Sequence, residues 1–145
     1  MKELPGKRSS LEADDLSESE EWQAYLDRFI KAYNALPELP TLLEAVAPLI
    51  FQYNITDRPE MNWWQKFEKD MIRWGMGENA ERDVPKVVHK TDFATMKKVT
   101  SGELDPVSAT MMGKYSVDGD LGKLMASATL LPLNPKAHAI ASSSQ

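Results

Sequence analysis

The spacing of apolar residues changes from a helical to a strand period near residue 50, and this change limits the chain to mixed folds. Between Trp22 and Leu36, large apolar side chains recur every three or four positions. From Phe51 to Ile55 they alternate with polar side chains. Because helices bury positions at the first period and half-buried strands at the second, we expect an α+β fold.

Alternation and β-branched residues also predict the rest of the sheet. Trp63, Phe67, Ile72 and Trp74 alternate with less apolar residues on either side of Lys69-Asp70, which is typical of a β-hairpin. The expected strands are 51–55, the two arms of the hairpin over 63–76, 84–90 and 114–118.

Capping residues mark the expected helices. Ser17 and Glu20 form a capping box for a helix over 18–35, and Thr41 can cap a shorter helix that ends before Pro48. Three aspartates precede later helices, which begin after Asp92, Asp105 and Asp120. Gly102 is suited to a left-handed helix end, and Pro132 ends the helix expected over 121–131.

The distribution of charge excludes a broad nucleic-acid interface. The chain has 22 acidic and 17 basic residues, and six of the acidic ones lie in residues 11–21. The remainder has 16 acidic and 17 basic residues, so it presents no basic field to phosphate backbones. We expect no nucleic-acid partner, although Lys86, Lys90, Lys97 and Lys98 with His89 could contact anionic lipid surfaces.

The residues for cofactor, metal and nucleophilic chemistry are missing or misplaced. With no cysteine and two histidines, the 145-residue chain offers no disulfide, zinc or iron-sulfur ligand set, so we predict no metal and no cofactor. The Gly75-Met-Gly77 pattern lacks a following helix to bind a pyrophosphate, and His89 is expected to be an ordinary strand residue. The N-terminus also lacks an apolar signal segment, which predicts a cytoplasmic protein.

Three motifs in the second half resemble the sterol carrier protein 2 family. In order, they are Thr91-Asp-Phe-Ala-Thr-Met, Gly102-Glu-Leu-Asp-Pro and Ala109-Thr-Met-Met-Gly-Lys-Tyr-Ser-Val-Asp-Gly-Asp. The resemblance implies a mostly antiparallel five-stranded sheet covered on one face by helices, with an apolar tunnel for a sterol, a fatty acid or a fatty acyl-CoA. It also implies that no tunnel residue is catalytic. Because Ser142-Ser-Ser-Gln145 differs from the peroxisomal signal typical of eukaryotic members, we expect a prokaryotic or cytoplasmic relative.

This resemblance divides the chain into four parts. We predict an acidic flexible leader over 1–16, an extra N-terminal helix over 17–37, the sterol-carrier-like domain over 38–132, and a flexible tail over 133–145. The extra helix is a candidate site for a protein partner if its Trp22, Phe29 and Tyr33 face is exposed.

The lipid-binding residues are predicted from the resemblance and from the methionine content. The resemblance places Leu121, Leu124, Met125 and Ala128 on a helix that lines the tunnel and could gate it. The chain has eight methionines, whose flexible thioethers can adapt to ligands of varied shape. The full predicted set is Phe93, Met96, Met111, Met112, Tyr115, Leu121, Leu124, Met125, Ala128 and Trp74.

Three functions remain open from the sequence. The first is non-enzymatic carriage of a lipid, with transient contact to a membrane surface. The second is an accessory module of the same fold that assembles lipid- or quinone-biosynthesis enzymes. The third, an acyl-handling enzyme, lacks a defensible nucleophile and base.

Overall fold

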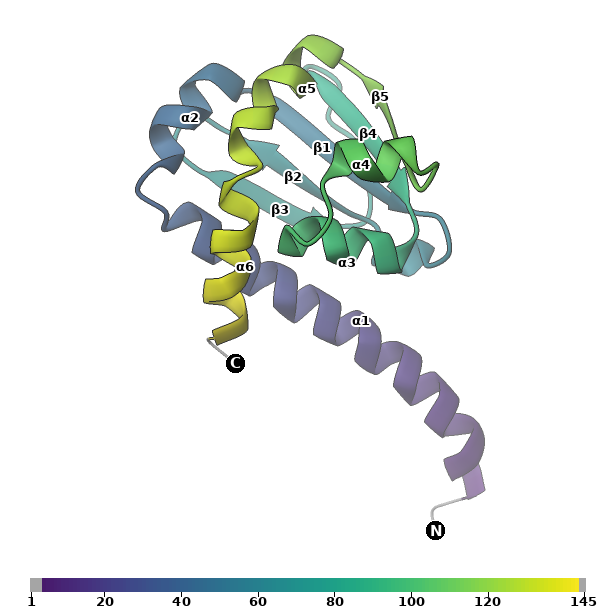
Figure 1. Ribbon diagram of the computed structural model, residues 1–145. Coiled ribbons are helices and arrows are strands. Elements are labelled where there is room, and N and C mark those ends of the chain that lie inside the picture. Colours follow the sequence, from purple (N-terminus) through teal and green to yellow (C-terminus); the bar gives the residue numbers. More distant parts are fainter. Residues whose placement is uncertain (1–3, 144–145) are drawn as a thin grey trace.

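The computed structural model describes the backbone of residues 4–143 and the side chains of residues 18–143. Its centre is a five-stranded sheet in the order β3-β2-β1-β4-β5 (Figure 1). The central pair β1 and β4 is parallel, and all other neighbouring pairs are antiparallel. The strands are β1 (Leu49–Ile55), β2 (Trp63–Phe67), β3 (Ile72–Met76), β4 (Lys86–Thr91) and β5 (Tyr115–Gly119).

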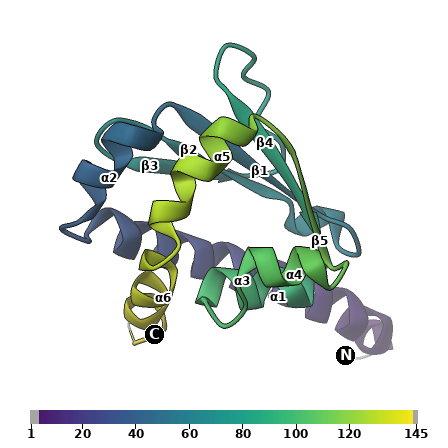
Figure 2. The ribbon, with the colours of Figure 1, turned by 45° about the horizontal axis from the view of Figure 1, so that its top comes forward.

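Helices cover one face of this sheet. Figure 2 shows α3, α4 and α6 together on the same side, and Figure 1 shows the chain from α5 to α6 crossing that face. The α-helices are α1 (Leu4–Asn34), α2 (Leu39–Val46), α3 (Phe93–Ser101), α4 (Pro106–Met111), α5 (Leu121–Ser127) and α6 (Leu133–Ser143). Short 3-10 helices η1 and η2 span Pro59–Met61 and Ala128–Leu130. The expected α+β sandwich is confirmed.

Three helices in the second half of the chain begin directly after an aspartate, as expected from the sequence. Asp92, Asp105 and Asp120 have extended backbones, and each side chain accepts a hydrogen bond from the backbone N–H three residues later. Gly102 ends α3 with a φ of 82°, the left-handed conformation expected for a C-terminal glycine. Local capping therefore fixes the boundaries of the elements that follow the sheet.

The second half of α1 belongs to the core. Trp22, Leu26, Phe29 and Tyr33 are buried on its inner face, and the Trp22 indole meets Phe93 edge to face. At the end of the helix, the Asn34 amide donates to the Ile72 carbonyl and accepts from the Ile72 N–H, at 2.9 and 2.7 Å. The helix is therefore anchored to the edge strand β3 and does not project from the domain there.

Three expected boundaries were wrong. Helix α1 begins at Leu4, so residues 4–16 of the predicted leader are helical, and residues 1–3 lie outside the described part. Helix α2 begins after Glu38 and has Pro40 in its first turn, so Thr41 is not its cap. The helix expected over 121–131 changes to 3-10 geometry at Ala128.

Residues 133–143 of the predicted flexible tail form a helix, and residues 144–145 lie outside the described part. Helix α6 packs against α1 and α3 and buries Leu133, Ala137 and Ala141. Arg28 of α1 donates to the Ala141 carbonyl at 3.1 Å. The small apolar residues of α6 gave little periodic signal in the sequence for a buried helix face, because alanine is compatible with both buried and exposed positions.

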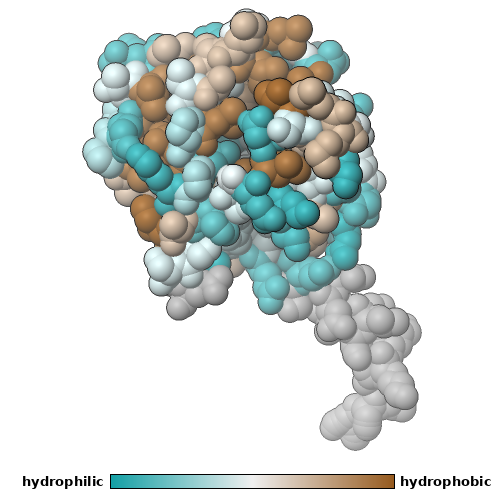
Figure 3. Space-filling model, in the orientation of Figure 1, coloured by the Kyte–Doolittle hydropathy of each residue, from teal (hydrophilic) through white to brown (hydrophobic). Residues whose placement is uncertain are grey.

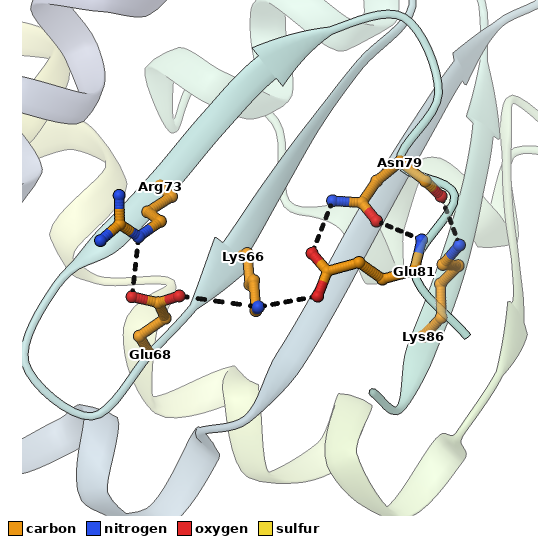
Figure 4. Close-up of polar contacts among 6 residues, drawn as sticks. All are labelled: Lys66, Glu68, Arg73, Asn79, Glu81 and Lys86. Atoms are coloured by element: carbon orange, nitrogen blue, oxygen red, sulfur yellow. Dashed lines mark hydrogen bonds and ion pairs between the residues drawn. The ribbon is translucent and has the colours of Figure 1, made fainter. Parts of the chain in front are cut away.

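A polar network occupies the opposite face of the sheet (Figure 4). Lys66 forms ion pairs with Glu81 at 2.9 Å and Glu68 at 3.6 Å, and Glu68 also pairs with Arg73. The 77–85 loop is held over this face because Gln52 donates to the Gly77 carbonyl. Among the described residues, the two faces of the sheet thus differ in chemistry: the apolar core lies on the helical side and the ion pairs lie on the other.

Candidate functional site

A cavity of about 280 Å³ lies between the helix-facing side of the sheet and the helices. Every strand except β3 contributes to its floor, and α3, α4, α5 and η2 contribute to its walls and roof. Its lining comprises Tyr33, Phe51, Tyr53, Gln65, Phe67, His89, Val99, Pro106, Val107, Thr110, Tyr115, Val117, Leu124, Met125, Ser127, Ala128, Leu130, Leu131 and Asn134. Among these described residues there is no Lys, Arg, Asp or Glu, so the cavity suits an uncharged ligand.

The floor follows from strand geometry. Side chains two positions apart point to the same face of a strand, so Phe51 and Tyr53 of β1 both face the helices. Register places Gln65 opposite Phe51 and His89 opposite Tyr53. The result is an aromatic surface with two polar side chains in it.

Both polar side chains of the floor are bonded to tyrosines. Gln65 donates from Nε2 to the Tyr53 hydroxyl at 2.7 Å, and His89 Nδ1 lies 2.7 Å from the Tyr115 hydroxyl. Burial lowers the pKa of His89 to about 3, so its imidazole is neutral at physiological pH. Burial also raises the pKa of Tyr115, and both rings are therefore uncharged hydrogen-bonding groups.

The roof is fixed to α1 by a tyrosine. The Tyr33 hydroxyl lies 2.7 Å from the Leu130 carbonyl and 2.8 Å from Oδ1 of Asn134. Since Tyr33 and Leu130 both line the cavity, α1 positions the segment that closes it. The N-terminal helix is thus part of the site.

Four of the ten predicted lipid-binding residues border the cavity. These are Tyr115, Leu124, Met125 and Ala128, and their role in lipid binding stays a prediction. The other six do not line it in the described chain: Phe93, Met96 and Trp74 pack in or against the core, and Met111, Met112 and Leu121 are exposed.

The predicted set included Tyr115 but missed the other residues of the floor. Alternation placed Phe51, Tyr53, Gln65, Phe67 and His89 in strands, but it did not show which face meets the cavity. A usable signal was present for Gln65, because it lies at the same two-residue period as Trp63 and Phe67 and therefore shares their face of the strand.

None of the four lysines considered as a contact for anionic lipid surfaces, Lys86, Lys90, Lys97 and Lys98, lines the cavity. Alternation along β4 turns Lys86 and Lys90 to the face opposite His89, and Lys86 bonds the Asn79 carbonyl. Lys97 lies over the Phe93 ring at 4.7 Å, in a separate groove between α1, α3 and α6. That groove, of about 580 Å³, also contains Glu18, Glu21 and Arg28, so it is less suited to an apolar ligand.

The described residues offer no metal site. Within residues 18–143, no three His, Cys, Asp or Glu side chains lie where they could hold a metal ion. In the same part of the chain, no helix has the length and apolar character needed to cross a membrane.

Comparison with known proteins agrees with this architecture. The sequence matches the SCP-2 sterol transfer family over residues 26–132. The chain belongs to this family. The family match begins at Leu26, inside α1, which is consistent with the burial of that helix in the SCP-2 core.

Solved structures with the SCP-2 fold align over most of the chain. The sterol carrier protein domain 2 of Helicoverpa armigera has a TM-score of 0.60 at 19% identity, covering 77% of this chain and 86% of that one. A chain described as UbiJ-SCP2 ubiquinone synthesis protein has a TM-score of 0.56 at 14% identity, covering 72% and 86%. A sterol carrier protein 2 crystal structure gives 0.55 at 18%, covering 81% and 93%. No match is found among curated proteins.

Proposed function

We propose that the protein binds an apolar lipid in the cavity and carries it without performing chemistry on it. The observation that supports this most directly is the uncharged, largely aromatic and aliphatic lining of the cavity in an SCP-2 family member. Burial of apolar ligand surface at about 25 cal/mol per Å² supplies the driving force. The ligand classes that the family resemblance implies are sterols, fatty acids and fatty acyl-CoAs.

An empty cavity of this size is costly. At about 24 cal/mol per Å³ for an enclosed void, leaving a cavity of about 280 Å³ empty costs at most roughly 7 kcal/mol, because water can enter through the mouth. Total stability is about 5–15 kcal/mol for a typical domain. We therefore expect a small apolar molecule to copurify with the protein, and native mass spectrometry of gently purified material detects it as added mass.

The mouth of the cavity is surrounded by exposed apolar side chains. Val107 and Met125 line the cavity and are also largely exposed to solvent, Met125 at 75%. Met111, Met112 and Leu121 extend this exposed surface along α4 and α5, and Figure 3 shows apolar side chains gathered on this side. Because the surface is continuous with the mouth, we propose that it contacts a lipid bilayer while the ligand enters or leaves, with α5 as the gate.

An accessory role in lipid or quinone biosynthesis is the alternative. It draws on the likeness in fold to the chain described as a ubiquinone synthesis protein. Docking was expected to use the Trp22, Phe29 and Tyr33 face of the N-terminal helix, and this face is buried inside the molecule. That burial favours carriage over docking through this helix.

A matched pair of variants on α5 tests carriage. Leu124 lines the cavity, whereas Leu121 on the same helix is exposed and lies outside the lining. We expect Leu124→Arg to abolish binding of decanol, measured by titration calorimetry, because it introduces a charge into an apolar space. Leu121→Arg should bind like the unmodified protein.

The outcome separates the two functions. Equal binding by both variants would place the ligand elsewhere, and no binding by the unmodified protein, together with a ligand-free native mass, would favour the accessory role. Circular dichroism checks that each variant unfolds cooperatively.

A further inference from the structure

Two buried polar atoms in the floor of the cavity lack a hydrogen-bond partner. They are Oε1 of Gln65 and Nε2 of His89. The exposed fractions of these residues are 7% and 4%, so bulk water does not reach them freely. Buried polar groups in folded proteins are nearly always paired, so an unpaired acceptor and an unpaired imidazole nitrogen beside one cavity require an explanation.

The two residues form one polar site around Tyr53. Gln65 bonds the Tyr53 hydroxyl, and the His89 ring centroid lies 4.7 Å from that of Tyr53. Strand β1 separates β2, which carries Gln65, from β4, which carries His89, and both side chains face the helices. Because both side chains line the same cavity and both contact Tyr53, we treat them as one candidate site for a small polar group.

The chemistry of the site selects among head groups. Gln65 Oε1 can only accept a hydrogen bond, while neutral His89 can donate or accept at Nε2 according to its tautomer. A hydroxyl both donates and accepts, so it can satisfy both atoms. An ionised carboxylate cannot donate to Gln65, and among the described lining residues no cation compensates its charge.

We propose that the cavity selects a neutral lipid with a hydroxyl head and holds this head inward, between Gln65 and His89. The apolar part then lies toward α4 and α5, and it leaves through the mouth at Val107 and Met125. This inference rests on the proposed carriage of a lipid, which it deepens by naming the head group. It assigns Gln65 and His89 as the residues that determine specificity.

The test compares three probes of similar chain length. Decanol can donate and accept, decyl methyl ether can only accept, and decanoate is ionised at neutral pH. Titration calorimetry with the full chain should show decanol binding about tenfold more tightly than the ether, the effect of one well-formed hydrogen bond. Decanoate should bind most weakly.

Two substitutions locate the preference. Gln65→Met removes the acceptor that only decanol can satisfy, so it should reduce the advantage of decanol over the ether to less than about threefold. His89→Phe removes a donor that both probes can use, so it should weaken the binding of decanol and the ether alike. Ser127→Ala is the matched control, because Ser127 also lines the cavity but its hydroxyl already bonds the Leu124 carbonyl. It should keep the advantage.

A spectroscopic readout keeps the test independent of variant folding. In the unmodified protein, decanol should shift the imidazole nitrogen resonances of His89 and leave those of His138, which bonds Tyr25 outside the cavity, unchanged. If the ether or decanoate binds as tightly as decanol, or if decanol leaves His89 unshifted, the head-group inference is wrong while carriage stands. If none of the three probes binds, carriage itself fails.

Discussion

Removing one hydroxyl from α1 should destabilise the roof of the cavity. Tyr33→Phe leaves the buried Leu130 carbonyl without its Tyr33 contact, and Tyr33 also reaches Asn134 on α6. Loss of a partner for a buried acceptor costs about 1–3 kcal/mol. With about 2–4 °C of Tm per kcal/mol for a domain near this size, about 2 kcal/mol lowers Tm by about 6 °C.

Tyr25→Phe is the control for this prediction. It makes the same chemical change on the same helix, but the Tyr25 hydroxyl and His138 are only half-buried, so water can replace the lost contact. We expect it to cost less than about 1 kcal/mol. Urea unfolding at fixed pH, followed by circular dichroism, measures both variants.

The two variants also distinguish a structural from a functional effect. Because Tyr33 lines the cavity, Tyr33→Phe should also release bound decanol faster, whereas Tyr25→Phe should not change the release rate. A loss of stability for Tyr25→Phe equal to that for Tyr33→Phe would refute the assignment of α1 as the support of the roof.

Two further predictions concern pH and the exposed methionines. Burial lowers the pKa of His89 from 6.5 to about 3, so between about pH 7 and pH 5 the unfolded chain binds a proton that the folded chain does not. The free energy of unfolding should therefore fall by about 2 kcal/mol over this range. His89→Phe should remove this part of the fall, as measured by urea unfolding. Met111→Asp with Met112→Asp should weaken cosedimentation with phosphatidylcholine vesicles and leave decanol binding intact, because both side chains lie outside the cavity. Ile140→Asp changes an exposed apolar position on α6 and is the control, so this variant should sediment with vesicles like the unmodified protein. If it loses as much vesicle binding as the methionine variant, the proposed contact through α4 is wrong.

The fold was predictable where local chemistry decides the structure. The aspartate caps and Gly102 act through bonds to residues three or four positions away, and strand alternation records the division between buried and exposed faces. Family membership followed from three motifs in the same region, and the match over residues 26–132 confirms it.

The site was less predictable because it depends on contacts between distant segments. Met111 and Met112 are consecutive apolar residues at the C-terminal end of α4, and both side chains are exposed to solvent. Helix α6 forms because α1 and α3 provide a surface for Ala137 and Ala141, which no local pattern around those alanines reveals. The polar pair in the floor depends on the register between three strands.

The contact between Asn34 and Ile72 has a consequence for self-association. Strand β3 lies at an edge of the sheet, where free backbone groups can pair with a strand of another molecule. The Asn34 amide occupies both the N–H and the carbonyl of Ile72, as a neighbouring strand would. A second chain that added to this edge would have to displace a helix anchored by its own aromatic face, so α1 protects the protein against aggregation through β3.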